Sequence, residues 1–272
     1  MRTFVLYIIL LVATASQVHG QSVQQVEQDI LGYLSKIQYW RYEYSAEDTN
    51  FSAEVSPVDT IEVANRELLQ YFLKVGVNNQ TMLSAPFNLL EKADIKIVTS
   101  PDKKMRIYSW DTHTGGTMHF FNTVAQYETG SGVTITEIRD KPEHYKDSMI
   151  PGNTYNLIYT MADKSGKKYY LPVYTAIYST KDVMKGIRAF SIENGKLLDA
   201  EIFKATNKTL SRIEYGYDYM TNYSFKKMKE EYTLYINKQK LYIPVVEGEK
   251  ITGRWLIYVW NGEQFVFDKN AK

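Results

Sequence analysis

The spacing of apolar residues predicts helices in the first third of the chain. One stripe recurs mostly at steps of three and four residues, as on one face of an amphipathic helix, and consists of Val23, Val26, Ile30, Leu31, Leu34 and Ile37. A second stripe predicts a helix that begins at Asp59 or Thr60 and ends at Gly76; it consists of Ile61, Ala64, Leu68, Leu69, Phe72 and Leu73. A shorter helical piece is expected over residues 86–93.

After residue 94 the apolar period changes to two, which is typical of β-strands. Short alternating segments are separated by polar turns, as in antiparallel meanders. Two Asn-Gly pairs, Asn194-Gly195 and Asn261-Gly262, give the strongest short-range hairpin signal that a sequence carries. These segments therefore predict neighbouring strands joined by tight turns.

Together these patterns predict an α+β fold. A helical N-terminal segment, residues 21–94, is expected to pack on a predominantly antiparallel β domain of about ten strands, residues 95–272. The polar stretch at 139–154 is the point at which the strands would divide into two sheets or sub-domains.

One segment resembles a known repeat. The run from Ile97 to Lys104, followed by Arg106 to Trp110, is similar to the start of one blade of a TolB-type β-propeller, which often opens with a Ser-Pro-Asp turn. The similarity covers about 15 residues and occurs once, whereas a propeller needs at least four recurring blades. It therefore implies a hairpin turn at Ser100-Pro101-Asp102-Lys103 in an ordinary sheet.

The first twenty residues are typical of a cleavable signal peptide. Arg2 precedes an uncharged apolar run from Phe4 to Ala13, and small residues precede an expected cut after Gly20. The apolar run is about half the roughly 20 residues that a transmembrane helix needs, so no transmembrane segment is expected after cleavage. We therefore expect an exported protein.

The absence of cysteine limits which cellular compartment and which kinds of catalysis are expected for this protein. The chain has no cysteine, which excludes lipid attachment, disulfides and thiolate catalysis or metal binding. A disulfide-free exported protein favours the periplasm or the exterior of a Gram-negative bacterium. The chain has 32 basic and 31 acidic residues, and loss of Arg2 with the signal peptide leaves 31 of each (32 − 1 against 31). Nucleic-acid binders show a basic excess, so nucleic acid is not an expected partner.

The candidate metal site lies in an unusual turn that contains two of the four histidines. Asp111 and His113 are two residues apart and would share one face of an extended strand. A turn at Gly115-Gly116 would bring His119 back beside them on the next strand. Carboxylate and imidazole groups so placed could hold a divalent metal, with Glu143 or His144 as a further ligand. The alternative is a structural turn in which Asp and Thr side chains bond turn amides.

The candidate binding face consists of tyrosines. The chain has 23 tyrosines, and Tyr215, Tyr217 and Tyr219 would line one face of a strand. Such a stripe can stack on sugar rings or form a protein interface, and its alternative role is half-buried packing in the sheet.

The sequence carries none of the common catalytic motifs, such as a nucleophile elbow, a His-Glu-x-x-His pair or a phosphate-binding loop. It therefore favours a non-catalytic protein over an enzyme. No motif indicates which cofactor, if any, the protein binds. The leading hypothesis is an exported envelope module that binds a protein or a glycan, and an inhibitor or immunity protein for a periplasmic toxin falls within it. The first alternative is a metal-dependent hydrolase that uses Asp111, His113 and His119. The second is a structural or assembly component of the envelope.

Overall fold

A computed structural model describes residues 21–45, 56–139, 151–222 and 233–270. The predicted signal peptide, residues 1–20, lies outside these ranges, as do Glu143 and His144. Within the described residues, no helix combines the length and the apolar character needed to cross a membrane.

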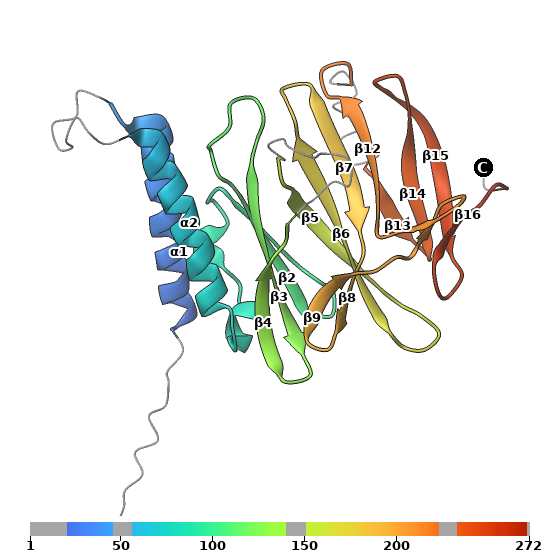
Figure 1. Ribbon diagram of the computed structural model, residues 1–272, viewed down its shortest axis with the longest axis horizontal. Coiled ribbons are helices and arrows are strands. Elements are labelled where there is room, and N and C mark those ends of the chain that lie inside the picture. Colours follow the sequence, from blue (N-terminus) through green and yellow to red (C-terminus); the bar gives the residue numbers. More distant parts are fainter. Residues whose placement is uncertain (1–20, 46–55, 140–150, 223–232, 271–272) are drawn as a thin grey trace, which may run out of the picture.

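The helical segment contains two long helices that pack side by side (Figure 1). Its elements are α1 Val23–Gln38, the π-helical turn η1 Tyr39–Glu43, α2 Pro57–Val75, α3 Gln80–Ser84 and the 3₁₀ turn η2 Asn88–Leu90. The predicted start of the second helix is a few residues late, because the hydroxyl of Ser56 accepts the backbone N–H of Asp59 and so makes Ser56 the N-cap. The short helix expected over residues 86–93 is reduced to η2.

The strands follow the helices along the chain and form three sheets. Sheet A contains β1 Ile95–Thr99, β2 Met105–Asp111, β3 Phe121–Thr129 and β4 Gly132–Glu137 in that spatial order. Sheet B runs β12-β7-β6-β8-β9, with β5 beside β6, and its strands are β5 Thr154–Ala162, β6 Lys168–Ile177, β7 Asp182–Arg188, β8 Phe190–Glu193, β9 Lys196–Asp199 and β12 Arg212–Asp218. Sheet C runs β11-β10-β16-β15-β14-β13, and its strands are β10 Phe203–Lys204, β11 Thr209–Leu210, β13 Tyr235–Asn237, β14 Lys240–Glu247, β15 Lys250–Trp260 and β16 Phe265–Phe267.

Helices and sheets follow one another as successive layers (Figure 1). A first core between the helices and sheet A joins Leu68 and Phe72 of α2 to Tyr108 and Trp110 of β2. A second core lies between sheets A and B, and a third lies between sheets B and C. Because β2 is packed on both faces, all seven of its residues are buried. The layers place the end of β2 directly under the helices.

The predicted α+β class, with helices followed by mostly antiparallel strands, is confirmed. The described strands number sixteen in three sheets, more than the sequence suggested, because several have only two to four residues and show no readable alternation. One pairing, β10 with β16, is parallel. The change from sheet A to sheet B falls between β4 and β5, around the polar stretch 139–154; the domain division expected there stays a prediction.

The two predicted Asn-Gly turns differ in outcome. Asn261-Gly262 lies between β15 and β16, but the last paired residues there are Trp260 and Phe265, so four residues connect these strands instead of two. Asn194-Gly195 joins β8 to β9, and both residues have the positive φ that such a two-residue turn requires (50° and 75°). The segment similar to a propeller blade is the β1–β2 hairpin, in which the Lys103 amide donates to the Ser100 carbonyl at 2.9 Å.

Candidate functional sites

The first candidate site is the turn that follows β2. Asp111 ends the strand, and its Oδ1 accepts the backbone N–H of His113 at 2.9 Å. This bond holds His113 in the left-handed region, at φ 56°. A residue there leaves the extended path, so the side chain of His113 does not share a face with that of Asp111. The predicted pairing of these two side chains on one face is therefore not what the turn produces.

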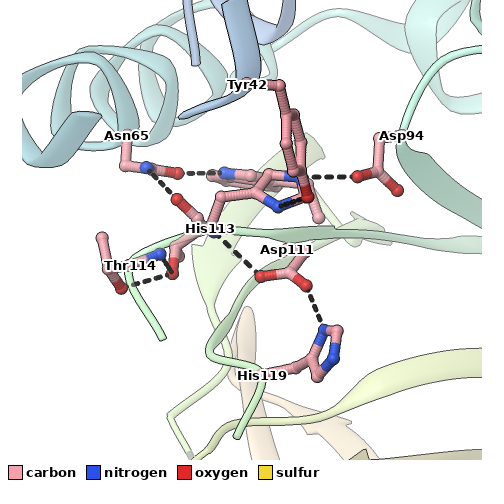
Figure 2. A network of polar contacts seen from close by, with 9 residues as sticks. Tyr42, Asn65, Asp94, Asp111, His113, Thr114 and His119 are labelled. Atoms are coloured by element: carbon pink, nitrogen blue, oxygen red, sulfur yellow. Dashed lines mark hydrogen bonds and ion pairs between the residues drawn. The ribbon is translucent and has the colours of Figure 1, made fainter. Parts of the chain in front are cut away.

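The imidazole of His113 is held between two other elements (Figure 2). Its Nε2 lies 2.6 Å from Oδ2 of Asp94, just before β1, and its Nδ1 lies 3.2 Å from the hydroxyl of Tyr42 in η1. The hydrogen bond to Asp94 raises the pKa of His113, partly opposed by burial, and the same bond lowers the pKa of Asp94. His113 therefore links the helical segment to sheet A.

His119 makes a second carboxylate contact on the other side of Asp111 (Figure 2). Its Nδ1 lies 2.5 Å from Oδ2 of Asp111, and its ring stacks on Phe121. The His119 side chain is 43% exposed, whereas that of Asp111 is 10% exposed. A buried carboxylate thus orients a half-exposed imidazole through Nδ1, and proton transfer or ligation would use the other ring nitrogen, Nε2.

A buried amide of the helix layer fixes the start of this turn. Asn65 of α2 donates from Nδ2 to the carbonyl of Thr112 at 2.8 Å and accepts from the indole of Trp110 at 3.0 Å. Both Asn65 and Trp110 are buried. The first residues of the turn are therefore fixed by the helix layer.

The structure brings Asp111 and His119 together and places the His113 ring against Asp94 instead. No group of three or more His, Asp or Glu side chains that could hold a metal ion is formed in the described ranges. The described residues form two Asp–His pairs, Asp94–His113 and Asp111–His119. Asp111 connects them, because it also accepts the backbone N–H of His113. The metal site at Asp111, His113 and His119 stays a prediction. Asp94 and Tyr42 were not foreseen, because nothing in the sequence shows that η1 and the start of β1 reach this turn.

The second candidate site is the tyrosine face of β12. Tyr215 and Tyr217 lie on one face as predicted, and their rings stack with centroids 6.1 Å apart and planes 24° apart. Both side chains are half-buried, and Tyr215 packs against the core between sheets B and C. Tyr219 lies one residue beyond the strand. Burial, and then the neighbouring Tyr219, raises the pKa of Tyr217 to about 12.

Sequence reasoning missed the lysine in this face. Lys185 of β7 lies directly opposite Tyr215, and its Nζ lies 2.9 Å from the hydroxyl of Thr233. Burial lowers the pKa of Lys185. The signal was present in the sequence: Lys185 lies between Val183 and Ile187 at the apolar positions of an alternating strand, so it had to point inward.

The two sites differ in chemistry. The turn carries paired carboxylates and imidazoles, and the β12 face carries stacked phenol rings with one ammonium. Compared with protein-family models, curated proteins and solved structures, the chain shows no significant match.

Proposed function

We propose that this protein is an exported envelope protein that binds a glycan without catalysis. The observation that carries the proposal is the stacked, half-buried pair Tyr215 and Tyr217 at the rim between sheets B and C. Aromatic rings bind the apolar face of sugar rings, and a phenol adds a hydroxyl that can hydrogen-bond to the ligand.

A glycan fits this face better than a protein partner does. A stable protein interface buries about 800 Å² on each partner and is built around a continuous apolar patch. In the described part of β12, two rings are half-buried on one face. Glu214 and Gly216 are exposed, but they lie on the opposite face of the strand and add nothing to this patch.

The binding experiment compares sugar affinity in matched variants. Isothermal titration against a panel of neutral and acidic oligosaccharides should show binding by the purified protein. Tyr217→Leu should weaken it at least about tenfold, since it removes the ring and keeps the apolar volume. Tyr33→Leu, a half-buried tyrosine on α1, is the control and should change nothing. Binding that survives in Tyr217→Leu would refute the proposed site, and no binding to any sugar would refute the proposed function.

Export is tested separately. We expect the protein recovered from the envelope fraction of a Gram-negative host to begin at Gln21, which N-terminal sequencing can establish. Recovery of the uncut chain from the cytoplasm would contradict the export proposal.

A second candidate function, metal-dependent hydrolysis, is favoured by one observation. Oδ2 of Asp111 orients Nδ1 of the half-exposed His119 at 2.5 Å. Metal analysis of the purified protein, beside an Asp111→Ala/His113→Ala variant, tests it. Stoichiometric zinc, manganese or iron that is lost in the variant would support this candidate, and equal metal in both would reject it. If both the sugar and the metal tests fail, a structural or assembly role is the conclusion.

A further inference from the structure

The strand registers place a polar row across sheet B. Thr175 of β6 is opposite Lys185 of β7, and Lys185 is opposite Tyr215 of β12. Directly opposed residues of antiparallel strands share a face, so these three side chains lie side by side. Thr175 also accepts a hydrogen bond from the amide of Asn156 at 3.2 Å.

This polar row lies between two apolar rows. The row on one side is part of the core between sheets B and C and consists of Val173, Ile187 and Ile213. The row on the other side is half-buried and consists of Ile177, Val183 and Tyr217. The Lys185 ammonium therefore lies at the rim of this core, in the row next to that of Tyr217.

Among the described residues, the ammonium of Lys185 has one hydrogen-bond partner. It has three N–H donors, and the hydroxyl of Thr233 accepts one of them at 2.9 Å. Within the described residues, no carboxylate lies within 4.0 Å of Nζ. Three more exposed lysines, Lys36, Lys167 and Lys168, each have a carboxylate partner.

A half-buried cation that has no counter-ion among the described residues is costly unless a further group occupies the position opposite it. Burial removes hydration from the ammonium, and a neutral hydroxyl restores only part of that loss. A ligand anion would restore the rest through a charge-assisted hydrogen bond.

We infer that Lys185 is the anion-binding residue of the tyrosine site and that its ligand is an acidic glycan. The inference rests on the proposed glycan-binding function. A uronate carboxylate pairs with the Lys185 ammonium, and the face of the same sugar ring packs on Tyr217. Thr175, opposite Lys185 in the sheet, and Thr233, in contact with its ammonium, provide hydroxyls for the hydroxyl groups of the sugar.

The test uses tetragalacturonate and its fully methyl-esterified form, which share sugar rings and differ in charge. Calorimetry with the purified protein should give at least about tenfold tighter binding of the acid, because only the acid can form a charge-assisted hydrogen bond with the ammonium. In Lys185→Met the preference for the acid over the ester should disappear. Lys204→Gln, an exposed lysine on β10, should keep the preference.

A second readout does not depend on this variant folding well. In ¹³C-methylated protein, the Lys185 dimethylamine should titrate at lower pH than the other lysines, and tetragalacturonate should raise its pKa. No change on addition of the acid would overturn the inference.

The outcomes separate this inference from the function on which it rests. Equal binding of the acid and the ester by the unmodified protein, abolished in Tyr217→Leu, would overturn the role of Lys185 and leave glycan binding in place. A preference that persists in Lys185→Met would also overturn it. If neither these tetramers nor any sugar of the wider panel binds, the glycan function itself fails. Displacement of the acid by tetraglutamate at equal affinity would show that the site selects an acidic peptide, against the inference.

Discussion

The side-chain oxygen of Asn65 on α2 accepts a hydrogen bond from the indole nitrogen of Trp110 on β2, at 3.0 Å. The same amide donates to the carbonyl of Thr112, at 2.8 Å, and to the carbonyl of Ile61 one helical turn earlier, at 2.9 Å. One buried amide therefore joins the helix layer to sheet A at the point where the Asp111 turn begins.

Removing this amide should destabilise the protein strongly. Asn65→Ala leaves the buried indole N–H of Trp110 and the carbonyl of Thr112 without this partner, and each such group costs about 1–3 kcal/mol. We expect a loss of about 2–4 kcal/mol in the free energy of unfolding, measured by urea denaturation. Arg66→Ala, an exposed neighbour on the same helix, should change it by less than about 0.5 kcal/mol. Equal effects of the two substitutions would contradict the role given to Asn65.

The Asp94–His113 pair should make stability depend on pH. The folded-state pKa of His113 is raised above its ordinary value of 6.5, so its contribution is complete below pH 6.5 and is lost as pH rises through the folded pKa. The folded-state pKa of Asp94 is lowered from 3.8, so its contribution is present above pH 3.8 and is lost as pH falls through its folded pKa. The pair stabilises most between these two ordinary values.

Asp94→Asn tests this window. Because Asp94 is 49% exposed, we expect a loss of only about 0.5–1 kcal/mol near pH 5, and a smaller loss at pH 8. Thermal unfolding at the two pH values measures it, and NMR titration should show a lower His113 pKa in the variant. Glu201→Gln, an exposed carboxylate, is the control. A loss that grows from pH 5 to pH 8 would contradict the assignment.

Local patterns in the sequence predicted the fold class but not the contacts between distant segments. The helical stripe from Val26 to Ile37 is buried as its spacing indicates, and the Asn194-Gly195 turn follows from its own backbone requirements. The very short strands of sheet C, such as β10, are formed by pairing with remote strands, so no local period marks them.

The candidate sites show the same division. The Tyr215–Tyr217 face follows from alternation along one strand, and an inward Lys185 was readable in the same way. The position of the His113 side chain could not be read from the sequence, because it depends on one positive φ and on Asp94, a carboxylate nineteen residues earlier. The return of His119 to Asp111 was expected, and the structure places these two in contact.

Gly186 should not tolerate a side chain. A Cβ at this position would lie 2.4 Å from the Tyr174 hydroxyl oxygen and 2.9 Å from the carbonyl of Ile213. Tyr174 is buried and donates to Glu214 at 2.6 Å, so its ring has little freedom to move. Gly186→Ala should therefore cost about 1–3 kcal/mol.

The matched control is Gly216, on the neighbouring strand β12. A Cβ there would meet only the carbonyl of Val183, at 3.8 Å, which is an ordinary contact. Gly216→Ala should leave the urea midpoint close to that of the unmodified protein. If Gly186→Ala were equally harmless, the close packing of Tyr174 against β7 would be refuted.

Lys185 should weaken the fold in the absence of a ligand. Its folded-state pKa is lowered by burial, so at neutral pH the folded protein holds a proton at a free-energy cost that the unfolded chain does not have. As pH rises above the folded pKa, the folded state releases that proton while the unfolded state keeps it up to about pH 10.5, and the unfolding free energy should increase. Replacing the ammonium by an apolar side chain should remove this cost at every pH.

Lys185→Met is therefore expected to be more stable than the unmodified protein by about 1 kcal/mol at pH 7, with a smaller difference at pH 10. Urea unfolding at both pH values measures the effect, and Lys204→Gln should show none. A residue that lowers stability and yet occupies the binding face is expected where function needs a charge. If Lys185→Met were less stable at pH 7, the ammonium would be a structural group satisfied by Thr233, and the reason for assigning it to a ligand would be lost.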